Sequence, residues 1–250
     1  MKILQVISYL YPAVAYGGPG KLVYDISQAL TVRNHQISIF ATDAFNKQRR
    51  RNNTDNISLN SEIEYRFFNN INNGLAYNYK AFVALGGINA ILNEAKKFDL
   101  VHVHEFFTPM TFAASRAKSK FSVPLVLSAH GTLSPFHLSN KNISKKIFMG
   151  IFGNNIIKNT SAFIAATDEE IENYRNLGAD KDKIHLVKNG INTAEFNLIP
   201  AKGKIRKKYK IQNAEIILLY IGRIHKLKGL SELIGAISLF KNDPPVKLII

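Results

Sequence analysis

The first 42 residues constrain the fold more than any other part of the chain. Lys2–Ser8 is apolar except for Gln5 and the terminal polar residues, which is typical of a strand buried in a parallel sheet. Pro19 suits the first position of a helix, and an apolar helix face continues from there to Arg33. A second apolar strand is expected over 36–42. Two strands joined by one helix predict a parallel sheet with right-handed crossovers.

The same alternation of strands and helices continues along the chain. Further strands are expected over 62–68, 99–105, 125–129, 162–166 and 184–187, and helices over 79–98, 108–120 and 140–159. The fold class predicted is therefore α/β. We expect a first parallel-sheet domain over 1–197, a basic linker over 198–213, and the first β-α-β of a second domain over 214–250.

The segment Leu218–Gly229, LLYIGRIHKLKG, has the pattern of an anion site. An apolar run ends at Gly222, a basic loop follows, and a second glycine opens a helix. Gly222 lets the backbone turn sharply, while Arg223 and Lys228 supply fixed positive charge suited to phosphate. A solvated basic loop is the alternative. The flanking glycines and the position at the carboxyl end of a strand favour the anion site.

Histidines and glycines follow other expected strands. His102 and His104 share one face of the strand 99–105, but a pair with no third ligand nearby does not favour a metal site. His130 comes directly after the strand 125–129, where α/β proteins bind ligands, and a histidine that only caps a loop is an equal alternative.

Gly17 and Gly18 follow the first strand without the spacing of a dinucleotide fingerprint, so a plain glycine turn is an equal alternative. Thr167 and Glu170 have capping-box spacing, which predicts that the acidic residues after Thr167 start a helix and take no part in chemistry.

Four stretches resemble the retaining glycosyltransferases of family 4, which have the GT-B arrangement of two facing Rossmann-like domains. The matching stretches are GR-x-x-x-x-KG at 222–229, D-x-V-H-x-H at 99–104, PLVLSAHGTLSP at 124–135 and VKNGINTAEF at 187–196. Asn192 replaces the usual Asp of the last motif. The resemblance covers nearly all 250 residues and implies a first Rossmann-like domain followed by the start of the second.

The resemblance also implies roles for individual residues. His130 would lie at the catalytic centre between donor sugar and acceptor, and the donor diphosphate would contact Arg223, Lys228, Gly17 and Gly18. His104, Gly131 and Thr132 would lie in the vicinity of the sugar and acceptor. Fixed cations would stabilise the charge of the leaving nucleoside diphosphate, so neither a metal nor another cofactor is expected. The carboxylate motif of the family, two Glu seven residues apart, would follow Ile250.

The expected function is retaining transfer of a sugar from a nucleoside-diphosphate sugar to a glycan or lipid-linked acceptor, in cell-surface polysaccharide or glycolipid synthesis. The alternative is an inactive fragment that only binds nucleotide or anionic lipid. We expect the 250 residues alone to be inactive, because later strands of these enzymes build the nucleoside pocket. The expected location is the cytoplasm, with peripheral contact at the inner face of the membrane as a further alternative.

The net charge of +15 implies an anionic partner. Lysines flank the helix 140–159, whose isoleucines and phenylalanines are expected to face the core, and three arginines gather at 49–51 within a polar segment expected to be mobile. Solvated basic faces are the first interpretation, and contact with an anionic membrane is the alternative. No nucleic acid is expected, since no binding motif accompanies the charge. The chain contains no Cys, which excludes disulfides.

Overall fold

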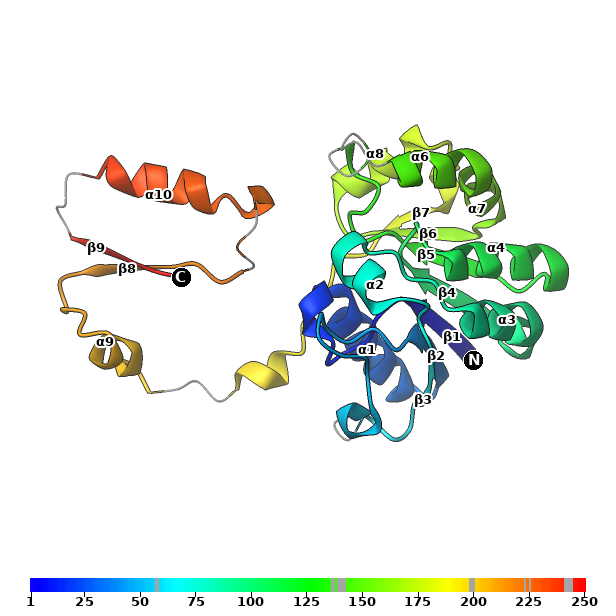
Figure 1. Cartoon of the computed structure of the whole chain (residues 1–250), viewed down its shortest axis with the longest axis horizontal. Coiled ribbons are helices and arrows are strands. Elements are labelled where there is room, and N and C mark those ends of the chain that lie inside the picture. The colour runs from blue at the N-terminus through cyan, green and yellow to red at the C-terminus, as the bar shows by residue number, and fades with distance from the viewer. Residues whose placement is uncertain are drawn as a thin grey trace. The chain divides into compact units, whose positions relative to one another are not determined.

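The structure is a computed structural model that describes residues 1–56, 59–135, 138, 143–197, 201–222, 224, 226–240 and 245–250. The chain divides into two compact units, residues 1–191 and 192–250. Figure 1 labels the helices and strands of both units.

The first unit is built on a seven-stranded sheet in which all neighbouring strands are parallel. The spatial order is β3-β2-β1-β4-β5-β6-β7. The strands are β1 (Lys2–Ile7), β2 (Gln36–Thr42), β3 (Glu64–Phe68), β4 (Leu100–His104), β5 (Leu125–Ser128), β6 (Ala162–Ala165) and β7 (Ile184–Leu186). This order reverses direction between β1 and β4, which makes their carboxyl ends a topological switch point where such sheets bind ligands.

Helices pack on both faces of this sheet (Figure 1). They are α1 (Pro19–Thr31), α2 (Asn73–Tyr79), α3 (Leu85–Glu94), α4 (Pro109–Phe121), α6 (Ile143–Phe148), α7 (Asn154–Asn159) and α8 (Asp168–Asn176). Side chains of α3, α4 and α7 share one buried cluster with Leu4 and Val103, and α1 packs on the opposite face with Ile3 and Ile7. The predicted α/β class is confirmed, and Pro19 opens α1 as expected.

The helix predicted over 79–98 is wrong at its start. Lys80 has a left-handed backbone with φ of 57°, which ends α2, and α3 begins only at Leu85. The Asn-rich stretch before it starts a helix, because the Asn72 side chain caps α2 by accepting a hydrogen bond from Leu75 N at 2.9 Å. The spacing of apolar residues in the sequence indicates which face of a helix is buried. It does not indicate where the backbone leaves the helical conformation.

The arginines at 49–51 all have partners within the first unit, although the Arg49 side chain stays exposed as predicted. The Arg51 guanidinium donates to the backbone carbonyls of Leu10 and Tyr11, and desolvation lowers its pKa to about 10. The other two arginines form the ion pairs Arg49–Asp55 and Arg50–Asp43. These internal partners weaken the case for a membrane contact at this segment.

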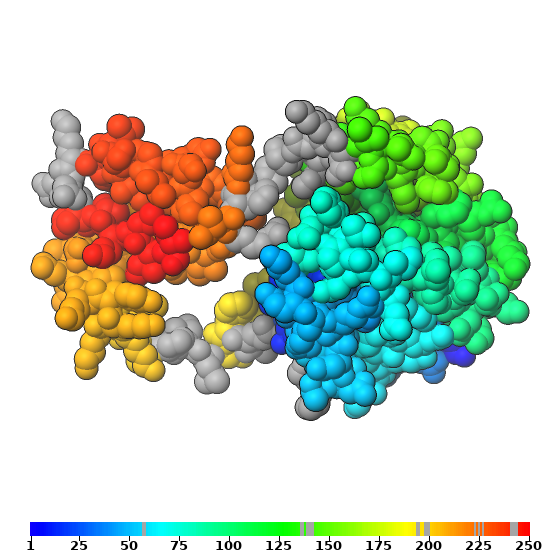
Figure 2. Space-filling model, in the orientation of Figure 1, coloured from blue at the N-terminus to red at the C-terminus, as the bar shows by residue number. Residues whose placement is uncertain are grey.

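The helix predicted over 140–159 is confirmed from residue 143, and it passes through a π-helical turn at Met149–Gly153. Phe148, Phe152 and Ile156 face the core as expected. The prediction fails for three isoleucines on the other side, which are 71%, 54% and 64% exposed: Ile143, Ile147 and Ile151. Their spacing of four places them in one outward stripe on α6 and the π-helical turn. The residues of this part of the chain have the green colours of the first unit in Figure 2.

The second unit contains a parallel pair, β8 (Ile216–Leu219) and β9 (Val246–Ile249), connected through α10 (Leu230–Ser238). This is the β-α-β expected there. The basic segment before β8 carries the short helix α9 (Lys204–Lys208). Within the described residues of both units, no helix combines the length and apolarity needed to cross a membrane.

Candidate functional site

Three histidines lie together beside the switch point, His102 in the middle of β4, His104 at its carboxyl end and His130 after β5. His102 and His104 lie on the same face of β4, and their ring centroids are 3.9 Å apart. His104 Nδ1 is 3.0 Å from His130 Nε2, and His104 Nε2 is 2.7 Å from Gln5 Oε1 on the neighbouring strand β1. The structure therefore joins two predicted site residues, His104 and His130, and adds Gln5, which the sequence marks only as a polar interruption.

Burial keeps this histidine cluster neutral. Desolvation, with a smaller contribution from His130, lowers the pKa of His102 to about 3, and desolvation also holds the pKa of His104 well below its usual range. The pKa of His130 is lowered by desolvation too, although the nearby Glu170 carboxylate opposes this effect. At neutral pH each imidazole therefore carries one N–H and one lone pair, and can donate one hydrogen bond and accept another.

The loop that carries His130 has two consecutive residues with positive φ, His130 at 50° and Gly131 at 74°. Thr132 closes this turn, because its hydroxyl donates to Ala129 O at 2.7 Å. The Glu170 carboxylate accepts from the backbone N–H of Gly131, and from that of Ala166 at 2.6 Å. These contacts fix the backbone around His130, so the imidazole is presented by a rigid turn.

Glu170 does more than the helix-starting role predicted for it. Thr167 caps α8 as expected, accepting from Glu170 N at 3.2 Å. The Glu170 side chain, however, connects α8 to the His130 turn. One turn further along α8, Tyr174 accepts from Ala129 N at 2.8 Å and donates to Ile164 O at 3.1 Å. The helix α8 thus anchors the end of β5 through two side chains, a tertiary role that the local capping pattern did not reveal.

Glu105 is a second acidic residue at the same edge of the sheet. It follows β4 with φ of 120°, a backbone conformation that few non-glycine residues adopt. Its carboxylate accepts from Ser8 N at 3.1 Å, at the end of β1. Desolvation raises the pKa of Glu105 to about 7, although the bond from Ser8 and the positive charge of Lys80 act in the opposite direction.

The two glycines after β1 differ in whether another residue could replace them. Gly17 has φ of 128°, so any other residue would be strained there. Gly18 has a helical φ of −72°, and a Cβ added to it would meet nothing within 4 Å. Gly20 is a third glycine that the sequence did not single out, because a Cβ there would lie 2.9 Å from Tyr9 O. The predicted diphosphate contacts of Gly17 and Gly18 stay predictions.

In the second unit, Lys228 lies in a short 3-10 helix (Lys226–Lys228) with its side chain exposed. Gly229 follows with φ of 65° and opens α10, which is the glycine-to-helix turn expected from the motif. Arg223, the other predicted diphosphate ligand, lies outside the described residues. Gly222, the first glycine of the motif, is exposed after β8.

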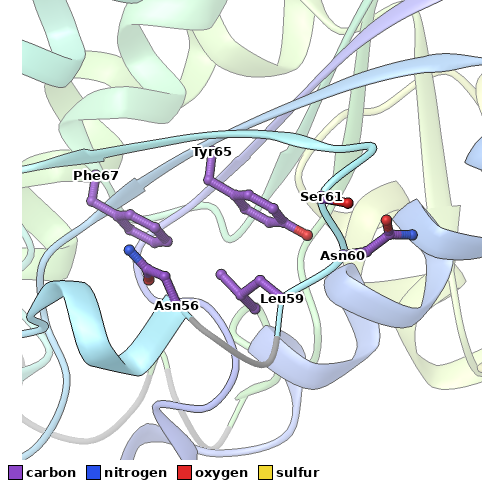
Figure 3. A pocket seen from close by; sticks show the side chains of 6 residues that line it. All are labelled: Asn56, Leu59, Asn60, Ser61, Tyr65 and Phe67. Carbon is purple, nitrogen blue, oxygen red and sulfur yellow. The ribbon is translucent and has the colours of Figure 1, made fainter.

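A pocket of about 460 Å³ lies in the first unit beside β3, the last strand at one side of the sheet (Figure 3). Tyr65 and Phe67 project from β3 toward Leu59 and Asn56 across it, and Asn60 and Ser61 complete the lining. Since β2 and β1 separate β3 from β4, this pocket is distinct from the histidine cluster.

Comparison with known proteins assigns the family. The sequence model described as Glycosyltransferase Family 4 matches residues 16–195, which is most of the first unit. The chain belongs to glycosyltransferase family 4. The matched range includes Gly17, the three histidines and the His130 turn, while Gln5, Lys228 and Gly229 lie outside it. Family membership confirms the resemblance found in the sequence.

Relatives within the family are distant and longer. D-inositol 3-phosphate glycosyltransferase of Jonesia denitrificans is 25% identical over 155 residues, covering 59% of this chain and 36% of that protein. Alpha-maltose-1-phosphate synthase of Mycolicibacterium smegmatis is 26% identical over 170 residues, covering 64% and 42%. The matched stretches thus span 36% and 42% of the length of these relatives.

Solved structures share the fold across the whole chain. The crystal structure of Anabaena HepE in complex with UDP and glucose has a TM-score of 0.69 at 19% identity, covering 99% of this chain and 60% of that one. The lipopolysaccharide outer core galactosyltransferase WaaB has a TM-score of 0.58 at 12% identity, with coverages of 99% and 60%. The family match and this shared architecture confirm the expected GT-B type of fold.

Proposed function

We propose that the protein is a glycosyltransferase that moves a sugar from a nucleoside-diphosphate sugar to a glycan or lipid-linked acceptor, with retention, in cell-surface polysaccharide or glycolipid synthesis. The observation that carries the proposal is the His130 turn. A neutral imidazole lies at the carboxyl end of β5 and is fixed by His104, while the Glu170 carboxylate fixes the following peptide. Support comes from the relative named as a D-inositol 3-phosphate glycosyltransferase, and from HepE, which was crystallised with UDP and glucose.

The chemistry proposed for the site needs few groups. As the bond to the donor sugar breaks, negative charge grows on the departing nucleoside diphosphate, and nearby fixed cations stabilise it. Arg223 and Lys228 would supply that charge from the second unit, so we propose transfer that is independent of metal. His130 would position the donor sugar and the acceptor. The alternative is an inactive domain that binds nucleotide or lipid, and it predicts binding without turnover.

The donor site can be tested by charge removal. In a chain extended to the length of its relatives, Arg223→Ala and Lys228→Ala are each expected to weaken UDP binding by about 1.5–3 kcal/mol, because each removes a charge-assisted contact. Isothermal titration calorimetry measures the affinity. Lys226→Ala is the matched control, since Lys226 is exposed on the same short helix. Equal weakening by Lys226→Ala and Lys228→Ala would indicate a general charge effect and contradict the assignment.

We also propose a peripheral contact with anionic membrane, through the outward stripe formed by Ile143, Ile147 and Ile151. Lysines accompany the stripe, and Lys146 next to Ile147 is exposed. Apolar side chains beside a cationic group suit the interface of an anionic bilayer, where they can bury in the lipid while the charge meets the headgroups. A lipid-linked acceptor would then be found in the plane of the membrane.

Vesicle co-sedimentation tests this contact. Binding is expected with phosphatidylglycerol vesicles and to fall as salt rises, because salt screens the attraction between exposed charges. Ile147→Asp should reduce binding, since it places an anion in the stripe. Val32→Asp is the control. Val32 is 80% exposed at the end of α1, so this substitution adds the same charge outside the stripe. Equal binding to phosphatidylcholine vesicles, or equal loss in both variants, would defeat the proposal.

A further inference from the structure

Gln5 is a polar residue in a position that packing alone would fill with an aliphatic side chain. It is fully buried in the middle of β1 between Leu4 and Val6. Its amide oxygen is bonded to His104, while its Nε2 group has no hydrogen-bond partner in the part of the chain that the structure describes. A buried amide that is only half satisfied is costly to the fold. The contact that could offset this cost is the hydrogen bond between the amide oxygen of Gln5 and His104.

The protons of the cluster follow from the acceptor on Gln5. The amide oxygen of Gln5 can only accept, so His104 must carry its proton on Nε2. Because burial keeps His104 neutral, its Nδ1 then has a lone pair and accepts. The only proton that can fill the 3.0 Å contact to His130 is therefore the one on His130 Nε2. His130 is neutral as well, which leaves its Nδ1 unprotonated.

We infer that Gln5 is a positioning residue which, through His104, fixes His130 in the tautomer with Nε2 protonated and Nδ1 bare. Neutral imidazole has two tautomers, and a hydrogen bond at one nitrogen decides which of them is present. Here Gln5 on β1 determines which nitrogen of His104 is protonated. His104 in turn determines which nitrogen of His130 is protonated. The bare Nδ1 of His130 is the atom that can accept a hydrogen bond from a sugar or acceptor hydroxyl.

The inference deepens the proposed function, since the use of Nδ1 rests on His130 facing the reactants. The tautomer itself does not depend on sugar transfer and can be measured without any substrate. A failure of the proposed function would leave the tautomer unchanged, and a wrong tautomer would leave the family assignment and the donor site untouched. The two are therefore separable by experiment.

Long-range proton–nitrogen NMR correlations of the histidine rings test the inference on the 250-residue chain labelled with ¹⁵N. The signals of His130 are identified by their absence in His130→Asn. The parent chain at pH 7.5 is expected to show His130 with Nε2 protonated and Nδ1 unprotonated. If Nδ1 carries the proton instead, the Gln5 amide donates to His104 with its nitrogen and the inference is overturned.

Two variants then test the cause. Gln5→Met keeps a long unbranched side chain but removes the acceptor, so His130 is expected to change to a mixture of both tautomers. Gln5→Glu keeps an acceptor oxygen and should retain the parent pattern, which a purely structural role for Gln5 would not predict. The ring of His102, held by Ser128 Oγ at 2.8 Å, is an internal control for the fold of the site. An unchanged single tautomer in Gln5→Met, with the His102 signals intact, would refute the role of Gln5.

Discussion

Replacing His130 by asparagine is expected to lower turnover about 100-fold or more while the domain stays folded. A side chain that positions a reacting group or exchanges a proton with it contributes roughly 10²- to 10⁴-fold. Asparagine is chosen because His130 has φ of 50°, and asparagine tolerates this left-handed conformation better than alanine does. The effect should therefore come from the lost imidazole and not from a strained turn.

Turnover is measured as transfer and as donor hydrolysis, in a chain extended to the length of its relatives. His185→Asn is the matched control, since His185 is an exposed histidine on β7, two strands away from β5. It should leave turnover unchanged. Near-normal turnover in His130→Asn would mean that the imidazole only stabilises its loop. Circular dichroism of both variants shows whether the fold survives.

Much of this architecture is readable from the sequence because buried parallel strands are short continuous apolar runs. All seven strands of the first unit lie within or next to the ranges expected for them, and the carboxyl ends that carry His104 and His130 follow directly from those ranges. Their mutual contact could not be read, because it depends on β4 and β5 being neighbours in register, with His104 opposite Ser128.

The residues that the sequence did not reveal act over long separations. Glu170 fits a capping pattern completely, and nothing local indicates that its carboxylate binds Gly131, 39 residues earlier. Gln5 is 99 residues from His104 and stands alone as a polar residue in an apolar strand. The sequence does contain one indication. An uncharged polar residue inside a buried strand requires a hydrogen-bond partner, and the switch point, where ligands bind, is where that partner is expected. The outward stripe was predicted to face the core because all apolar residues of 140–159 were assigned to one buried face.

Glu105→Gln is expected to change how stability depends on pH, and the sign follows from the surroundings of the carboxyl group. Burial raises the pKa of Glu105 from 4.5 to about 7 in the folded chain. The folded state therefore binds a proton more tightly than the unfolded chain does. The free energy of unfolding contributed by Glu105 is fully present below about pH 4.5 and is lost as the pH rises to about 7. The loss is on the order of 3 kcal/mol, since one pKa unit corresponds to about 1.4 kcal/mol.

The histidine cluster acts in the opposite direction and has to be separated from this effect. The pKa values of His102, His104 and His130 are lowered in the folded state, so their contribution is present above about pH 6.5 and is lost as the pH falls. The parent chain combines both contributions. The difference between Glu105→Gln and the parent contains only that of Glu105, because the histidines are common to both.

Glutamine keeps the shape of the side chain and can still accept from Ser8 N, but it cannot ionise. At pH 8 the variant should therefore be more stable than the parent, and the gain should shrink toward zero as the pH is lowered to 5. Urea unfolding followed by circular dichroism at several pH values measures this difference. Glu62→Gln, which changes an exposed carboxylate just before β3, should show no such trend. A gain that stayed constant from pH 5 to pH 8 would mean that Glu105 is ionised throughout. Its contact with Ser8 and the charge of Lys80 would then outweigh its burial.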